Sequence, residues 1–314
     1  MIVLFLKDGL GNQLFEYAFA RRLSQIYGDR VVINRIYFKR NKERSCQLER
    51  LALAKDVTYS GGIASFLFLL LLEFRIFLSL GPKFYLIHRD QEAFNRVFGG
   101  AEEIFRRCQR HGVYLSTSPY QYFDGFTFPG RRVKLVFGNF EHASFVKECG
   151  EGLREELRLK DASGIEGYLG RGECNVSVHI RRGDYLNPEW KSLNVCDEVY
   201  FIKAMKHISS ICPDAVFNVF SNTAADLEWI RNNYHLEGNV RYVDTGMDDV
   251  SDFFIMSSCR HFIISNSTYS WWAAYLSQAE DKIVVVPDVW SVGSPKSEGL
   301  YLPNFVRVKG GRDL

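Results

Sequence analysis

Two adjacent arginines stand in the run His179-Ile180-Arg181-Arg182-Gly183-Asp184, directly after a short apolar stretch. Guanidinium groups on a glycine-containing loop offer fixed forks of donors that suit phosphate oxygens. Asp184 could orient one guanidinium or accept a proton. The run therefore predicts a phosphate site. The alternative is a surface Arg-Arg pair beside a solvated aspartate, since such dipeptides are common.

A second polar run, Ser265-Asn266-Ser267-Thr268, lies between an apolar stretch and the pair Trp271-Trp272. Ser267 or Thr268 is a natural N-cap for a helix. Free N–H groups and hydroxyls at a helix N-terminus favour an anion. The run predicts either a second phosphate contact or an ordinary capped helix with buried tryptophans, and the residues alone do not separate the two.

A third run, Gly9-Leu10-Gly11-Asn12-Gln13, follows the apolar start of the chain. It has the strand–turn–helix placement of a dinucleotide site but lacks the third glycine, so the signal is weak. The glycines could let the backbone approach a ligand, with Asn12 and Gln13 as hydrogen-bond donors.

The sequence contains no Asp-x-Asp pair of the kind that holds a divalent metal in many sugar-nucleotide transferases, and no His/Cys cluster at zinc spacing. The adjacent Asp248 and Asp249 open a predicted helix, where carboxylates favour the helix dipole. We therefore expect no metal and no other cofactor. A departing diphosphate would be stabilised by Arg181, Arg182 and a helix N-terminus.

The elements that must position these runs alternate between strand and helix patterns, which predicts parallel sheets covered on both faces. In the second half we expect strands at 175–180, 216–220, 240–243, 262–265 and 283–286, with helices at 198–210, 224–233, 250–258 and 268–278. In the first half we expect strands at 2–6, 31–34 and 134–139, with helices at 12–27 and 145–157. The pattern blurs between 35 and 132.

These elements predict an α/β protein of two Rossmann-like domains facing a cleft. The glycine-rich segment 160–173 is the expected boundary, which gives an N-terminal domain of residues 1–165 and a C-terminal domain of residues 166–314. Ligands bind such sheets beyond the carboxyl ends of their strands.

Composition excludes some classes of protein. The net charge of +2 gives no reason to expect a nucleic-acid partner. Seven scattered cysteines without a Cys-x-x-Cys pair suggest reduced thiols in a cytosolic protein. The apolar start of the chain is typical of a strand and lacks the features of a signal peptide. Residues 63–72 carry no charge and predict a buried helix, the alternative being peripheral membrane contact through residues 63–80.

Taken together, GLGNQLFEYA from residue 9, HIRRGDY from 179, FSN from 220 and ISNSTYSWWAAYLS from 264 resemble glycosyltransferase family 11, the bacterial and animal α-1,2-fucosyltransferases. The matching segments cover about a fifth of the chain, in order nearly from end to end. The resemblance implies a GT-B architecture, an inverting mechanism, GDP-β-L-fucose as the donor and no metal.

Carried over by position, Arg181 would contact the pyrophosphate with support from Arg182, and Ser267 and Thr268 would take phosphate oxygens. His179 and Asp184 would shape the loop, and Asn12 would reach the donor from the opposite lobe. The full set expected to bind the donor is His179, Arg181, Arg182, Asn12, Gln13, Gly11, Ser221, Ser265, Asn266, Ser267 and Thr268. Two positions depart from the family: Asp8 stands where glycine is usual, and Tyr269 where phenylalanine is usual.

The expected reaction is a single displacement by the 2-hydroxyl of a terminal β-galactoside, in surface-glycan, lipopolysaccharide O-antigen or oligosaccharide synthesis. Arg181 would be catalytic, and Asp8, Asp184 and Glu16 are candidate general bases. Residues 35–132 would select the acceptor, which could be lipid-linked. The reaction would take place in the cytoplasm, at the inner face of the membrane. The alternatives are a transferase of the same fold with another donor or linkage, and a catalytically silent nucleotide- or glycan-binding protein.

Overall fold

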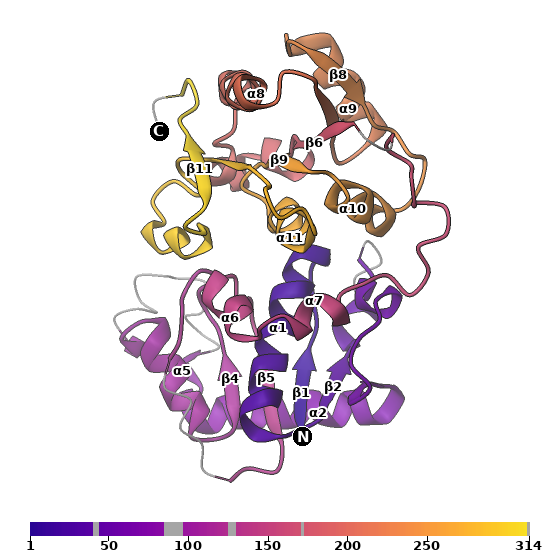
Figure 1. Cartoon of the computed structure of the whole chain (residues 1–314). Helices are drawn as coiled ribbons and strands as arrows, with labels where there is room; N and C mark the ends of the chain where they lie inside the picture. The colour runs from indigo at the N-terminus through magenta and orange to yellow at the C-terminus, as the bar shows by residue number, and fades with distance from the viewer. Residues whose placement is uncertain (40–43, 85–96, 125–129, 171–172, 313–314) are drawn as a thin grey trace. The chain divides into compact units, whose positions relative to one another are not determined.

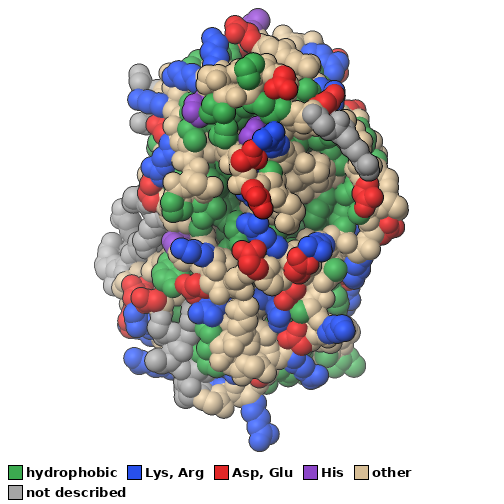
Figure 2. All heavy atoms as spheres, in the orientation of Figure 1, with side chains coloured by type: hydrophobic (Ala, Val, Ile, Leu, Met, Phe, Trp, Pro, Cys, Tyr) green, Lys and Arg blue, Asp and Glu red, His purple; other side chains and the backbone are tan. Residues whose placement is uncertain are grey.

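The computed structural model describes residues 1–39, 44–84, 97–124, 130–170 and 173–312 (Figure 1). The chain forms two compact units, Met1–Arg158 and Leu159–Leu314. The predicted boundary between 165 and 166 lies close to this division, and residues 171–172 of the predicted linker lie outside the described residues. Figure 2 shows acidic and basic side chains interspersed on the face in view.

The N-terminal unit is built on a parallel five-stranded sheet of order β3-β2-β1-β5-β4. Its strands are β1 (Ile2–Phe5), β2 (Val31–Asn34), β3 (Val57–Ser60), β4 (Val113–Leu115) and β5 (Lys134–Phe137). Its helices are α1 (Leu10–Tyr27), α2 (Gly62–Leu80), α5 (Ala101–Gln109), α6 (Ala143–Glu148) and α7 (Gly152–Glu156), with 3₁₀ turns η1 (Ile36–Lys39) and η2 (Gln47–Arg50).

Helices cover both faces of this sheet, with α1 and α2 on opposite sides in Figure 1. Every residue of β1 is buried, as expected for a central parallel strand. Val3 and Phe5 of β1 share a core with α2 and α5. Gly28 ends α1 in the left-handed conformation, with its N–H donating to the Ser24 carbonyl.

The C-terminal unit holds a parallel six-stranded sheet of order β11-β10-β9-β6-β7-β8. Its strands are β6 (Cys174–His179), β7 (Ala215–Phe220), β8 (Asn239–Tyr242), β9 (His261–Ile263), β10 (Val284–Pro287) and β11 (Phe305–Val308). Its helices are α8 (Glu198–Ile211), α9 (Ala224–Asn233), α10 (Asp249–Ser257) and α11 (Thr268–Leu276), with 3₁₀ turns η3 (Gly183–Leu186), η4 (Pro188–Leu193) and η5 (Pro295–Leu300).

Side-chain caps explain where three of these helices begin. Asp197, Thr223 and Asp248 each accept a hydrogen bond from an N–H in the first turn of α8, α9 and α10. The strand order reverses at β6: the chain builds outward through β7 and β8, then returns to β9 on the other side of β6. Such a reversal is the usual place for a ligand at the carboxyl edge of a sheet.

The α/β class is confirmed, and so are the predicted strands that begin each unit. The blurred segment 35–132 also contains β3, β4, α2 and α5, while its residues 40–43, 85–96 and 125–129 lie outside the described residues. Strand β11 was not predicted. Its residues are only partly buried at the edge of the sheet, so they lack the continuous apolar run of a central strand.

The prediction that residues 63–72 form a buried helix is right about the helix and wrong about its burial. The segment is helical, within α2, but only Ser65, Leu72, Ile76 and Leu80 of that helix are buried. Within the described ranges, α2 is the one helix that is long and apolar enough to cross a membrane by length and composition. Its apolar residues extend around the helix, and those that pack into the core of the unit lie on one side.

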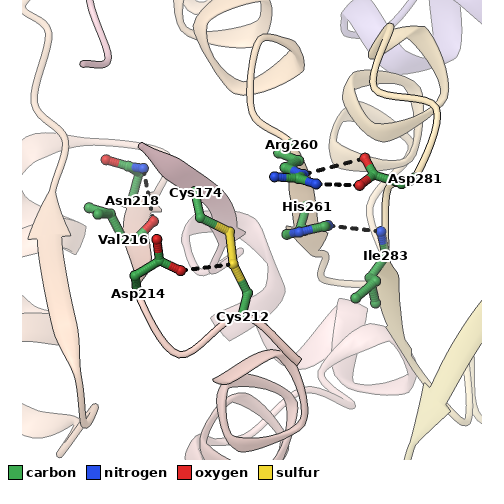
Figure 3. The surroundings of a disulfide bond; sticks show 9 residues. All are labelled: Cys174, Cys212, Asp214, Val216, Asn218, Arg260, His261, Asp281 and Ile283. Carbon is green, nitrogen blue, oxygen red and sulfur yellow. Dashed lines mark hydrogen bonds and ion pairs between the residues drawn. A yellow bond between two sulfur atoms is a disulfide. The ribbon is translucent and has the colours of Figure 1, made fainter. Parts of the chain in front are cut away.

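The expectation of reduced thiols is wrong for one pair, because Cys174 and Cys212 form a disulfide (Figure 3). The two residues are far apart in sequence, but the start of β6 and the C-cap of α8 meet at one end of the sheet. The other five cysteines are free.

Candidate phosphate-binding site

The loop after β6 is held from both neighbouring strands. The N–H of Ile180 donates to the carbonyl of Phe220 at the end of β7 (2.9 Å). On the β9 side, Ser265 Oγ accepts the Arg181 N–H (3.0 Å) and donates to the His179 carbonyl (2.7 Å). The three strands therefore fix the backbone at Arg181 at the point where the strand order reverses.

Ser221 and Asn222, from the run that follows β7, hold the same loop. Ser221 Oγ donates to the Ile180 carbonyl (2.8 Å), and Asn222 Oδ1 accepts the Arg182 N–H (3.1 Å). Gly183 has φ +39°, and a Cβ there would lie 3.1 Å from Asn222 Nδ2. The close approach of Asn222 together with the positive φ requires glycine at this position.

Of the two arginines that follow β6, Arg181 is the one whose guanidinium could contact a ligand. Its guanidinium lies against Asp184 Oδ1 (Nη2–Oδ1 2.8 Å, Nε–Oδ1 3.1 Å) and 5.4 Å from the centre of the Tyr185 ring. The side chain is 20% exposed. Asp184 thus orients Arg181, one of the two roles expected for it, and its engagement makes it less suited to act as a base.

Arg182 turns away onto α9. Its guanidinium carbon lies 3.2 Å from the centre of the Trp229 ring, and its Nε lies 3.4 Å from Asp226 Oδ1. That Nε is buried without a hydrogen-bond partner in the described part of the chain. Arg182 is therefore tied to the protein, and neither Trp229 nor Asp226 was found by sequence reasoning. A cation and an aromatic separated by 47 positions give no local signal.

His179 is buried beneath this loop. Its ring centre lies 5.6 Å from that of Tyr269, and burial together with the nearby Arg181 charge lowers its pKa to about 3. The imidazole is neutral at physiological pH, and no described residue forms a hydrogen bond with its Nδ1. His179 therefore adds no charge beside Arg181 and supports the loop from below.

The second polar run lies beside Arg181, as predicted, but its side chains differ in role. Asn266 donates both amide hydrogens to the protein, to the carbonyls of Leu193 and Trp290 (2.8 Å each). Ser267 is the N-cap residue of α11, and Thr268 is its first residue. Ser267 and Thr268 thus present the start of a helix to the edge that carries Arg181, a geometry suited to an anion.

Trp271 and Trp272 are fully buried, and the Trp271 indole donates to the Leu300 carbonyl (2.7 Å). Of the two alternatives for this run, the burial of both tryptophans is therefore what the structure shows, while the start of the helix remains a candidate anion site. Tyr269 is half-buried, and its hydroxyl donates to the Asp249 carbonyl.

The first polar run begins α1 in the other unit. Both amide hydrogens of Gln13 are donated within the protein, to the carbonyls of Asp8 (2.9 Å) and Ser45 (2.8 Å), and its Oε1 accepts the Gln47 N–H (2.9 Å). Gln13 therefore holds the loop, and the expected donation of its amide to a ligand is not what the structure shows. Gly11 and the half-buried Asn12 lie in the first turn of α1.

Three carboxylates gather at the carboxyl end of β1. Asp8 has φ +60°, is paired with Lys7 (Nζ–Oδ2 3.1 Å), and has a side chain 44% exposed. Glu16 accepts the Lys7 N–H (3.1 Å), and Glu141 accepts from Asn139 (3.0 Å). The positive φ at Asp8 gives a physical reason why glycine would be usual there.

The two glutamates of this cluster are buried, which raises their pKa values. Burial raises the pKa of Glu141 to about 7, against the opposing effects of Asn139 and Lys7, and raises that of Glu16 well above its usual range. One Glu16 carboxylate oxygen is also buried without a partner among the described residues. Sequence reasoning missed Glu141, although it closely follows a strand, β5, that pairs with β1.

One group of metal-ligand type occurs in the described residues: the sulfurs of Cys174 and Cys212 and a ring nitrogen of His261, all within 4.8 Å (Figure 3). It lies at the start of β6, away from Arg181. Metal binding by cysteine needs thiolates, and both sulfurs are joined in the disulfide. His261 Nδ1 accepts the Ile283 N–H (3.1 Å).

Comparison with solved structures supports the fold. The chain is similar to the fucosyltransferase NodZ from Bradyrhizobium, with a TM-score of 0.50 and 12% sequence identity over 88% of this chain and 92% of that one. At this identity the likeness concerns the fold alone, and the expected GT-B type, with its two parallel sheets, is confirmed.

Sequence comparison gives the family. The chain is 27% identical over 310 residues to the Escherichia coli O-antigen biosynthesis glycosyltransferase WbnK, covering 93% of this chain and 96% of that protein. It is 30% identical over 156 residues to an Escherichia coli alpha-1,2-colitosyltransferase (48% and 51% covered). It is also 30% identical over 185 residues to human galactoside alpha-(1,2)-fucosyltransferase 1 (52% and 50% covered). The latter two matches span about half of each relative. Residues 116–309, more than half of the chain, match glycosyl transferase family 11, and the protein is therefore a glycosyltransferase that belongs to this family.

Proposed function

We propose that the protein transfers L-fucose from GDP-β-L-fucose to the 2-hydroxyl of a terminal β-galactoside, with inversion and without a metal. The observation that carries the proposal is Arg181, held by Asp184 and by the backbone contact with Ser265, beside the start of α11. Family membership and the fucosyltransferase among the relatives support fucose as the sugar.

Charge explains what Arg181 would do. As the bond from fucose to the β-phosphate breaks, negative charge moves onto the phosphate oxygens, and a fixed guanidinium stabilises that charge most when the bond is breaking. Asp184 is then a positioning residue, and Arg182, packed on Trp229, supports the loop. With Arg181 and the helix N-terminus supplying positive potential, the proposal needs no divalent ion.

The proton of the attacking hydroxyl needs an acceptor. Of the candidates, Asp184 orients Arg181 and Glu16 is buried, which leaves Asp8, whose half-exposed side chain is paired with Lys7. We therefore assign this role to Asp8, with Glu16 and Glu141 beneath it. The proposal puts the reaction in the cytoplasm at the inner face of the membrane, on a surface-glycan acceptor such as an O-antigen unit. The O-antigen biosynthesis relative supports an acceptor of this kind.

One alternative has an observation in its favour: the colitosyltransferase relative makes transfer of a different deoxy sugar the second candidate. A silent binding protein is the third. The loop geometry at Arg181 would be the same for all three.

The deciding experiment is a GDP-release assay with GDP-fucose and lactose in the presence of EDTA, followed by mass spectrometry and NMR of the product. Acceptor-dependent release with an α-1,2-linked product supports the proposal. Release that requires added Mg²⁺ or Mn²⁺ overturns the metal-free part. Binding of GDP-fucose without transfer across a panel of galactosides favours the silent protein, and failure to bind GDP-fucose overturns the donor assignment.

A further inference from the structure

The outer face of α2 (Gly62–Leu80) carries a continuous apolar stripe. Seven large side chains recur at spacings of one, three or four residues and are each between 48% and 78% exposed. At 100° per residue they span about 120° of the helix circumference. A helix that faces water carries charged or polar residues on this side. The stripe consists of Ile63, Phe66, Leu67, Leu70, Phe74, Phe77 and Leu78.

The opposite face of the helix holds it to the protein. Leu72, Ile76 and Leu80 pack into the core shared with Val3 and Phe5 of β1. A helix that spans a bilayer exposes its surface to lipid or to other membrane segments, whereas one side of α2 is taken up by the sheet. With its 19 residues and mean hydropathy of 2.2, α2 therefore suits a position along a membrane surface better than one across it.

Positive charge collects at the C-terminal half of the helix. Arg75 donates to the Val133 carbonyl (2.7 Å), and a Cβ on Gly112 would lie 2.9 Å from its Nη1 and 3.5 Å from Arg131 Cβ. Burial and the charge of Arg131 both lower the pKa of Arg75, which is in keeping with two close cations. The exposed Lys83 follows the end of the helix, and Glu73 is the one acidic residue within it.

We propose that this stripe and its basic end, together the α2 docking face, bind the surface of a bilayer that contains anionic lipids. Arg75, Arg131 and Lys83 complement acidic headgroups, while the stripe enters the boundary of the acyl chains. A second protein is a poorer match, because protein interfaces carry about one hydrogen bond per 100–200 Å² and the stripe has no hydrogen-bonding side chain.

The α2 docking face also lies near a residue of the proposed reaction. At the start of α2, the Asn34 side chain, at the carboxyl end of β2, donates to the Ser65 carbonyl (3.0 Å). One end of the membrane-bound helix would therefore lie at the sheet edge that carries Asp8, within reach of a lipid-linked acceptor. This last consequence rests on the proposed function, whereas membrane binding does not.

The test is flotation of the full chain with vesicles of phosphatidylcholine alone or with 30 mol% phosphatidylglycerol, a composition we choose as roughly that of an anionic surface. The variant Phe74→Gln/Phe77→Gln removes apolar area from the stripe. The matched control Ile26→Gln/Ile211→Gln changes two exposed apolar residues elsewhere. A third variant, Lys83→Gln/Arg131→Gln, removes charge alone.

We expect binding that increases with phosphatidylglycerol, a fall of about 30-fold in the partition coefficient of the stripe variant, and no change in the control. The charge variant should lose its preference for anionic vesicles and its sensitivity to salt. Circular dichroism and GDP release with lactose should stay unchanged in all variants, which separates a failure of docking from a failure of transfer. Absent vesicle binding, equal binding by the stripe variant, or a dimer that this variant dissociates in the absence of lipid would each overturn the proposal.

Discussion

Replacing each of the two adjacent arginines with alanine should produce opposite kinds of defect. Arg181 ends on an open loop, held by Asp184, whereas Arg182 is packed between Trp229 and Asp226. We expect Arg181→Ala to lose turnover while keeping its stability. We expect Arg182→Ala to lose stability while keeping much more of its turnover.

The structure gives a magnitude for each change. A unit charge 4 Å from a phosphate oxygen is worth about 4 kcal/mol at an effective dielectric of 20. Asp184 lies 2.8 Å from the guanidinium and offsets part of this, which leaves about 3 kcal/mol, or roughly two decades in kcat. For Arg182, the contact with Trp229 and the ion pair with a mostly buried Asp226 together are worth about 1–3 kcal/mol of unfolding free energy.

The assay is GDP release with saturating GDP-fucose and lactose, paired with urea unfolding of each variant. Arg181→Lys serves as an intermediate, because it keeps the charge and loses the fork of donors. The reasoning is refuted by an Arg181→Ala enzyme whose kcat stays within threefold of the parent. It is also refuted by an Arg182→Ala enzyme that remains as stable as the parent yet is as inactive as Arg181→Ala.

Three further changes test other parts of the structure. Asp8→Gly should stabilise the protein by about 1 kcal/mol in urea unfolding, because glycine adopts φ +60° freely, and should lower kcat by about two decades if Asp8 takes the proton of the acceptor hydroxyl. Asp8→Asn should lower kcat without that stabilisation. Unchanged turnover in both variants would exclude Asp8 as the general base. Burial raises the Glu141 pKa to about 7, so the folded state holds this proton more tightly than the unfolded state does. The free energy of unfolding should therefore fall as pH rises from about 4.5 to about 7, by at most about 1.4 kcal/mol per pH unit. Glu141→Gln should flatten that dependence in urea titrations, and an unchanged slope would show that Glu141 does not titrate there. Gly183→Ala should lower the melting temperature and raise KM for GDP-fucose, because position 183 has a positive φ and a Cβ there would press on the Asn222 side chain. The control is Gly152→Ala: Gly152 is exposed and a Cβ there would meet nothing within 4 Å, so the melting temperature and KM should stay unchanged.

The sequence alone determined the fold class and the runs from which the candidate phosphate site is built. Alternating strand and helix patterns set two parallel sheets, since short apolar runs between amphipathic helices have few other stable arrangements. The carboxyl ends of parallel strands lie at one edge of a sheet, so the runs at 179 and 264 were placed where they could meet. The contact between Arg181 and Ser265 shows that they do.

Only the tertiary structure decided which member of each run is tied into the protein by its own side-chain contacts. Arg181 and Arg182 are chemically identical in sequence, and their side chains diverge because Asp226 and Trp229, from another helix, attract the second. Ser265 and Gln13 were equally suited to bind a ligand, yet their polar atoms are used to tie loops together.

The buried side of α2 and the disulfide partners also could not be predicted from the sequence alone. Hydropathy identified the helix, but the side that meets the sheet depends on which residues pack against Val3 and Phe5, and nothing local to α2 encodes that. Cys174 and Cys212 meet because α8 returns the chain to the start of β6. Sequence patterns report the energetics of neighbours along the chain, whereas side-chain partners are set by elements that arrive from elsewhere in the fold.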